Sequence, residues 1–175
     1  MAIIVETGVG IANANSYISR VDADAYHSLY NNTDWAGLDA DKEQALILAT
    51  RSLDLLYGPR FLSFKRITNV SPLLFPRMFF YDNNQHWVTE TTIPQCIKDA
   101  VCEIALMHMN GVDIFPLPNI DSNIKSNTVE IGAIKISNNY SSTQGVTETF
   151  SSFRKIDLIL WTVLKQKLTR INFVL

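Results

Sequence analysis

The stretch from Asp39 to Tyr57 constrains the fold more than any other part of this sequence. Its apolar residues recur at spacings of three and four, which predicts one helix with a wide apolar face. Gly58 and Pro59 follow at once and form a strong stop signal for the helix. A helix with such a face is buried against other elements. The residues of the face are Ala45, Leu46, Leu48, Ala49, Leu53, Leu55 and Leu56.

Shorter elements are predicted on both sides of this helix. Helical spacing and end signals indicate three further helices, and alternation of apolar and polar residues indicates a β-hairpin with its turn near Gly132. The predicted pieces are helices at 22–31, 94–111 and 151–167, a strand at 3–6, the hairpin at 126–137 and a loop at 138–149. Residues 59–92 show no clean periodicity and are interpreted as a long ordered excursion, a kind of loop that is usually functional.

The fold class that these elements define is mainly α. It is a small helical domain with a long ordered loop excursion, a small β element and a C-terminal helix. A length of 175 residues favours a single domain. Within it we expect a helical body at 1–111 that carries the 59–92 excursion, a β element with loops at 112–150, and a C-terminal helix with a docking tail at 151–175.

Composition and charge exclude several classes of protein. Apolar residues make up 47% of the chain and charged residues only 18%, which excludes intrinsic disorder. The excess of apolar residues lies either in a larger core or on surfaces that contact other subunits. The net charge of −2 argues against binding nucleic acid mainly through phosphates. No membrane span or signal peptide is recognisable, so we expect the chain to be made and kept in a cytoplasm.

No motif in the sequence carries catalytic or ligand-binding chemistry. Gly8 and Gly10 follow a predicted strand, but Asn13 stands where a dinucleotide-binding motif requires Gly or Ala, so we interpret them as an ordinary turn. Cys96 and Cys102 are expected to be small core residues. The three histidines, His27, His86 and His108, lack metal-ligand spacing. We therefore expect no enzyme activity, no cofactor and no metal site.

One stretch combines basic and aromatic residues, and it allows two interpretations. Bases could stack on the aromatics while the cations pair with phosphates, as on a single-strand-binding surface. Alternatively, the aromatics are core or interface anchors and the cations meet carboxylates. We favour the second interpretation, because the rest of the chain is acidic and most of these aromatics lie beside prolines. The candidate DNA-binding residues are Arg60, Lys65, Arg66 and Arg77, and the aromatics are Phe61, Phe64, Phe75, Phe79, Phe80 and Tyr81.

The C-terminal segment 151–175 is apolar on more than one side. One buried face cannot account for all of its apolar residues, so we expect it to bind another subunit. The alternative is that the helix simply completes the core. Aromatic residues dominate interface energetics, which makes Trp161 and Phe173 the main anchor candidates, with Leu164 and Leu175 beside them.

Several phrases of the sequence, in this order and spacing, resemble a known family. They are Ile-Val-Glu-Thr-Gly-Val-Gly-Ile-Ala-Asn-Ala-Asn-Ser-Tyr-Ile-Ser at 3–18, Ala-Asp-Ala-Tyr-His at 23–27, Ala-Thr-Arg-Ser-Leu-Asp at 49–54, Tyr-Gly at 57–58, Phe-Pro-Arg at 75–77, and Ile-Pro at 93–94 before the helix that holds Ala100 to Ala105. The family comprises small tailed-phage proteins that are often labelled DnaT-like single-stranded-DNA-binding proteins. They look like head–tail connector adaptors, also called head-completion proteins.

This resemblance covers about residues 1–110 and implies a structural role in the virion. Such adaptors form a homo-oligomeric ring, commonly of twelve copies, beneath the portal protein at the head–tail junction. They contact portal and tail proteins, and phage DNA passes through their channel. The resemblance implies synthesis in the bacterial host cytoplasm and no membrane partner. The DnaT-like label, with single-stranded-DNA binding, is the alternative function.

Overall fold

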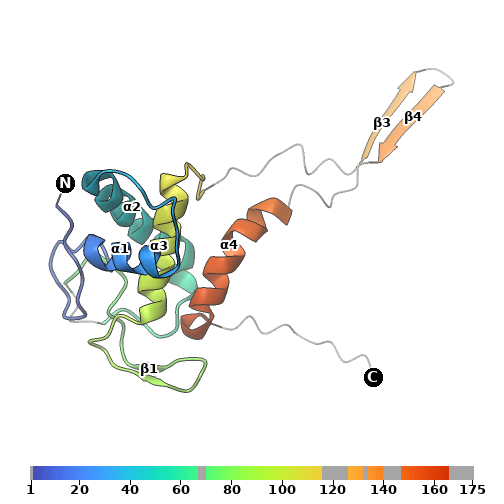
Figure 1. Cartoon of the computed structure of the whole chain (residues 1–175). Coiled ribbons are helices and arrows are strands. Elements are labelled where there is room, and N and C mark those ends of the chain that lie inside the picture. Colours follow the sequence, from blue (N-terminus) through green and yellow to red (C-terminus); the bar gives the residue numbers. More distant parts are fainter. Residues whose placement is uncertain (1, 67–69, 116–125, 132–133, 140–146, 166–175) are drawn as a thin grey trace, which may run out of the picture. The chain divides into compact units, whose positions relative to one another are not determined.

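The chain is described here from a computed structural model, which describes residues 2–66, 70–115, 126–131, 134–139 and 147–165. These residues divide into two compact units (Figure 1). The body comprises residues up to Ile114 together with those from Leu158 onward, and the second unit spans Phe115–Asp157. The mainly helical fold class with a small β element and a C-terminal helix is confirmed, whereas the assignment of a single domain stays a prediction.

Three helices build the body: α1 (Arg20–Leu29), α2 (Asp39–Tyr57) and α3 (Gln95–Met109). The closest packing is between α2 and α3, and α1 contacts both (Figure 1). The buried core between them includes Leu46, Leu53, Ile97, Val101 and Ile104, each 0% exposed.

The apolar face of α2 is narrower than its sequence predicts. Ala45, Leu46, Ala49 and Leu53 are buried, but Leu48 is 42% exposed and Leu55 is 61% exposed. The rest of the body therefore covers only part of the predicted apolar face of α2.

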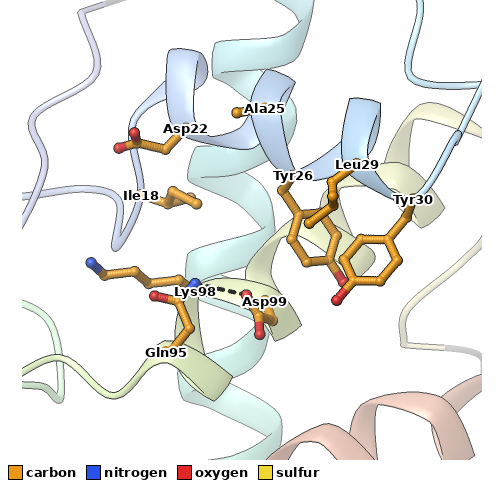
Figure 2. Close-up of a pocket in the computed structure, with 9 residues that line it drawn as sticks. All are labelled: Ile18, Asp22, Ala25, Tyr26, Leu29, Tyr30, Gln95, Lys98 and Asp99. Atoms are coloured by element: carbon orange, nitrogen blue, oxygen red, sulfur yellow. Dashed lines mark hydrogen bonds between the residues drawn. The ribbon is translucent and has the colours of Figure 1, made fainter.

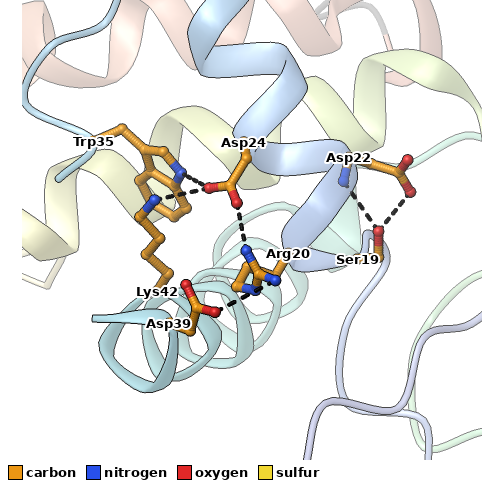
Figure 3. A network of polar contacts seen from close by, with 7 residues as sticks. All are labelled: Ser19, Arg20, Asp22, Asp24, Trp35, Asp39 and Lys42. Carbon is orange, nitrogen blue, oxygen red and sulfur yellow. Dashed lines mark hydrogen bonds and ion pairs between the residues drawn. The ribbon is translucent and has the colours of Figure 1, made fainter. Parts of the chain in front are cut away.

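An ion-pair network joins α1 to the start of α2 (Figure 3). Asp24 accepts from Arg20 at 2.6 Å, from Lys42 at 2.9 Å and from the indole N–H of Trp35 at 2.7 Å. Burial alone would raise the pKa of Asp24, but the bonds from Lys42 and Trp35 outweigh it and the pKa is lowered. Asp24 thus links two helices. Ser19 caps α1 by accepting from the amide of Asp22.

Two antiparallel hairpins are present in the described residues. In the excursion, β1 (Phe80–Tyr81) pairs with β2 (Trp87–Val88), so that Tyr81 faces Trp87 across the ladder. In the second unit, β3 (Ser126–Ile131) pairs with β4 (Ile134–Asn139), which confirms the predicted hairpin. The predicted turn at Gly132 lies outside the described residues. The strand predicted at 3–6 is wrong, because Val5 forms only an isolated bridge with Ser16.

The C-terminal helix differs from the prediction at both ends. Helix α4 spans Thr147–Leu160, so residues 147–149 are helical and not loop, and a short 3₁₀ helix follows at Trp161–Val163. The α-helix ends early because Leu164 adopts an extended backbone and forms an antiparallel bridge with Phe61 of the body. A tertiary contact therefore overrides the helical pattern of the sequence.

Phe75 anchors the excursion in the core, as its sequence context predicts. It is 1% exposed, and its ring packs edge-on against Tyr17 at 6.0 Å and Phe61 at 5.1 Å. Arg77 was expected to pair with an acid. Its guanidinium donates to the carbonyls of Leu62 and Ser63, and its charge acts on Asp54, whose pKa it lowers. Buried aromatic rings, together with hydrogen bonds from the Arg77 side chain to main-chain carbonyls, thus fix the excursion.

We predict that Phe75→Ala destabilises the body by about 3–5 kcal/mol, because it removes a fully buried aromatic side chain and leaves a cavity. Thermal and urea unfolding followed by circular dichroism measure this. Phe64→Ala is the matched control, since Phe64 is 75% exposed in the same excursion. Equal midpoints for Phe75→Ala and the unchanged chain would show that Phe75 is no anchor.

Candidate interaction surfaces

The glycine-containing turn near the N-terminus holds a carboxylate of its own chain. Glu6, 1% exposed, accepts from the amides of Gly8 at 2.9 Å, Gly10 at 2.8 Å and Ile11 at 2.7 Å. Gly8 has φ +107°, and a Cβ there would meet the Thr91 carbonyl oxygen at 1.9 Å. The amides that a phosphate would need are therefore bonded to Glu6, and the interpretation of this segment as a turn is confirmed.

A buried polar junction fixes the excursion to α2. The Tyr17 hydroxyl donates to Asp54 at 2.8 Å and accepts from the amide of Phe75 at 3.1 Å, while Asp54 accepts from the amide of Leu74 at 3.0 Å. Burial raises the pKa of Asp54 to about 6, although these bonds act in the opposite direction. Burial, and then the Asp54 charge, raise the pKa of Tyr17, so the phenol stays protonated and keeps its donor role.

The four predicted DNA-binding cations make contacts inside their own chain. Lys65 donates to the Ser71 carbonyl at 2.5 Å, and Arg66 donates to the Val9 carbonyl at 2.8 Å and the Glu90 carbonyl at 3.3 Å. Arg77 is held as described above, and the Arg60 guanidinium lies 5.2 Å from the centre of the Tyr57 ring. These contacts brace the excursion, and the DNA-binding role of the four cations stays a prediction.

The aromatics of the excursion separate into a buried and an exposed group. Phe61 and Phe75 belong to the core, whereas Phe79, Tyr81 and Trp87 are 54%, 60% and 51% exposed. The Phe79 ring stacks on Trp87 with centroids 5.2 Å apart, and Tyr81 meets Trp87 edge-on at 4.8 Å. We call these three residues the aromatic face.

Trp87 was not among the residues that the sequence singled out. The polar turn at Asp82-Asn83-Asn84 between aromatic residues was a usable signal for this hairpin. The cross-strand register of Tyr81 and Trp87, which brings their rings together, becomes visible only in the structure.

The hairpin tip and the 3₁₀ helix after α4 are joined by one asparagine. The Asn83 amide N–H donates to the Thr162 carbonyl at 2.8 Å, and its side chain donates to the carbonyls of Leu164, at 2.9 Å, and Trp161. Lys165, the last described residue, donates its amide to the Arg60 carbonyl at 2.7 Å. The described chain therefore ends at a fixed point of the body, tied to the hairpin through Asn83.

The predicted interface residues do not share one environment. Trp161 is 44% exposed, as a docking anchor requires, whereas Leu164 is 4% exposed and packs within the body. Phe173 and Leu175 lie outside the described residues. The docking role of the segment stays a prediction, and the burial of Leu164 leaves it little surface to offer a partner.

A hollow of about 480 Å³ lies between α1 and the start of α3 (Figure 2). Tyr26, Leu29 and Tyr30 line it from α1, and Gln95 and Lys98 line it from α3. The Tyr26 hydroxyl donates to Glu103 at 2.8 Å, and burial together with this carboxylate raises its pKa. The tyrosine is thus held as a neutral hydrogen-bond donor, which suits a structural role.

The titratable side chains of the described residues include types that can act as metal ligands. In this part of the chain, His, Cys, Asp and Glu form no group of three or more that could hold a metal ion. Both cysteines are free, Cys102 is 0% exposed, and burial raises its thiol pKa. The expectations of no enzyme activity and no metal site stay predictions. No described helix combines the length and the apolar character that crossing a bilayer requires.

The described elements define a small, mainly helical protein with a small β element. Residues 1–175 match the family model described as "Putative DnaT-like ssDNA binding protein", and the chain belongs to this family. No curated protein and no solved structure shows significant similarity to the chain.

We predict that Asp54→Asn changes how stability depends on pH. The folded-state pKa of Asp54, about 6, lies above its ordinary value of 3.8, so the fold favours the neutral acid. This contribution is fully present below about pH 4 and is lost as the pH rises through 6. The melting temperature of the variant relative to the unchanged chain should therefore increase between pH 4 and pH 7. Parallel profiles for both proteins would contradict it, and Asp34→Asn, at an exposed position, is the control.

Proposed function

We propose that this chain is a structural virion protein of a tailed phage, a head–tail connector adaptor that forms a ring between portal and tail. The phrases at 3–18, 49–54 and 75–77 carry the resemblance to such adaptors. One observation carries the proposal further. The cations of the basic-aromatic stretch bond to carbonyls and rings of their own chain, so the stretch serves to fix the excursion.

Charge supports the same role. The net charge is −2, and residues 79–92, which bear the aromatic face, include Asp82 and Glu90 but no lysine or arginine. Tight binding of a nucleic-acid backbone gains most of its free energy from cations that replace counterions. A channel through which DNA slides requires the opposite, a surface that does not retain phosphates.

Single-stranded-DNA binding is the second candidate function. The family description names it, and the aromatic face offers exposed rings of the kind on which bases stack. The absence of lysine and arginine from 79–92 weighs against it, because such platforms combine stacking with a positively charged groove.

We predict weak binding of single-stranded DNA. At physiological salt the dissociation constant should lie in the nonspecific range of about 10⁻⁴–10⁻⁶ M, as measured by fluorescence anisotropy over a salt series. A nanomolar, salt-sensitive constant would establish the DNA-binding function instead. Its loss on replacing Arg60, Lys65 and Arg66 would place the phosphates there, and its loss in Trp87→Ala would place the bases on the aromatic face.

We predict that deleting residues 168–175 leaves the protein folded but abolishes its assembly on the portal. Electron microscopy and native mass spectrometry of the protein mixed with its portal measure assembly, and thermal unfolding measures folding. Leu55→Ser, on the exposed side of α2, is a surface control that should still assemble. Normal assembly of the truncated protein, or its failure to fold, would exclude the docking role of the tail.

A further inference from the structure

The aromatic face is the largest group of exposed rings in mutual contact among the described residues. Phe79, Tyr81 and Trp87 point to the same side of the β1–β2 hairpin, as their register and ring contacts show. Each is more than half exposed in this chain. Contiguous exposed apolar surface of this kind marks a docking site, and tryptophan and tyrosine are the residues that most often anchor interfaces.

The charges near the face indicate a cationic, apolar occupant. Asp82 lies in the turn of the hairpin and Glu90 follows its second strand, and residues 79–92 contain no lysine or arginine. The histidine of this segment, His86, lies 3.6 Å from Asp82. The sequence after Lys165 has the complementary composition. It contains Lys167 and Arg170, no Asp or Glu side chain, and the apolar residues Leu168, Ile171, Phe173, Val174 and Leu175.

The length and the starting point of this tail allow it to reach such a face. Ten residues follow Lys165, and an extended chain of that length spans at most about 33–36 Å. The tail starts from a fixed point, because Lys165 is bonded to Arg60, and the 3₁₀ helix before it is bonded to Asn83 at the hairpin tip.

We propose that the aromatic face receives residues 166–175 of a neighbouring copy of this chain. This inference rests on the proposed function, because a contact between two different surfaces of identical subunits is the type that closes into rings. The apolar side chains of the tail pack on Trp87 and its two neighbours, and the tail cations face the hairpin carboxylates. The occupation of the face by the chain's own tail is the competing arrangement.

The test is a titration of the ¹⁵N-labelled full-length chain with a synthetic peptide of residues 166–175, followed by NMR. We expect saturable shifts of the Trp87 indole N–H and of hairpin amides. The Trp35 indole N–H, buried and bonded to Asp24, is the control within the same spectrum. A scrambled peptide of the same composition should bind at least about tenfold more weakly, the loss expected when an interface anchor is misplaced.

Variants locate the contact. Trp87→Ser and Tyr81→Ser should each weaken peptide binding at least about tenfold, while Leu55→Ser leaves it unchanged. Two surface variants are used so that a folding defect in one does not decide the result. Absence of saturable shifts, or shifts away from the hairpin, would overturn the inference. So would peptide binding that appears only after residues 168–175 are deleted from a chain that is monomeric at the same concentration, since the chain's own tail would then occupy the face.

The results of this test distinguish a failure of the tail contact from a failure of the proposed function. Assembly on the portal without peptide binding would exclude only the tail contact. Peptide binding without any portal assembly would retain the contact and reject the adaptor function. Displacement of the peptide by a single-stranded oligonucleotide that binds the Trp87 indole more tightly would assign the face to DNA and overturn the inference.

Discussion

The contact of Tyr17 with Asp54 is the interaction on which the rest of the body depends. It joins the N-terminal loop, helix α2 and the excursion through one phenol, which donates to Asp54 and accepts from Phe75. A buried carboxylate is costly unless it is hydrogen-bonded, and these bonds compensate it only in part, since its pKa is still raised to about 6. Tyr17, Asp54 and Phe75 lie in the segments 3–18, 49–54 and 75–77, which carry the family resemblance. Their contact gives a physical explanation for the occurrence of these segments in one sequence.

Once that junction is formed, the excursion needs partners for its many main-chain groups. Buried carbonyls and amides must be bonded, and without regular secondary structure the side chains must supply the bonds. Lys65, Arg66 and Arg77 do so by donating to carbonyls, and Glu6 does so for amides of the N-terminal turn. Charged residues in this protein are therefore used inside the fold, which explains how a charge-poor chain holds a long segment without helices in one conformation.

Two elements were predicted correctly from local signals in the sequence. The bounds of α2 follow from its periodicity and its glycine–proline end, and the β3–β4 hairpin follows from alternation. Prediction failed where a distant contact decided. Helix α4 ends at Leu160 because Leu164 pairs with Phe61, and Arg77 bonds to carbonyls that only folding brings near. The aromatic face was missed because period and spacing do not reveal which of several aromatics are buried.

The position of Asn83 has a consequence for any partner of this protein. Its bonds to Thr162 and Leu164 hold the hairpin tip against the segment that leads into the C-terminal tail. Each such bond contributes about 0.5–1.5 kcal/mol, enough to couple two surfaces when several act together. A ligand that repositions the hairpin acts on these bonds, and a partner that pulls on the tail acts on the same bonds. The proposed binding at the aromatic face and the proposed docking through the C-terminal segment would therefore be linked by the same few hydrogen bonds, and linkage would require each to alter the affinity of the other equally.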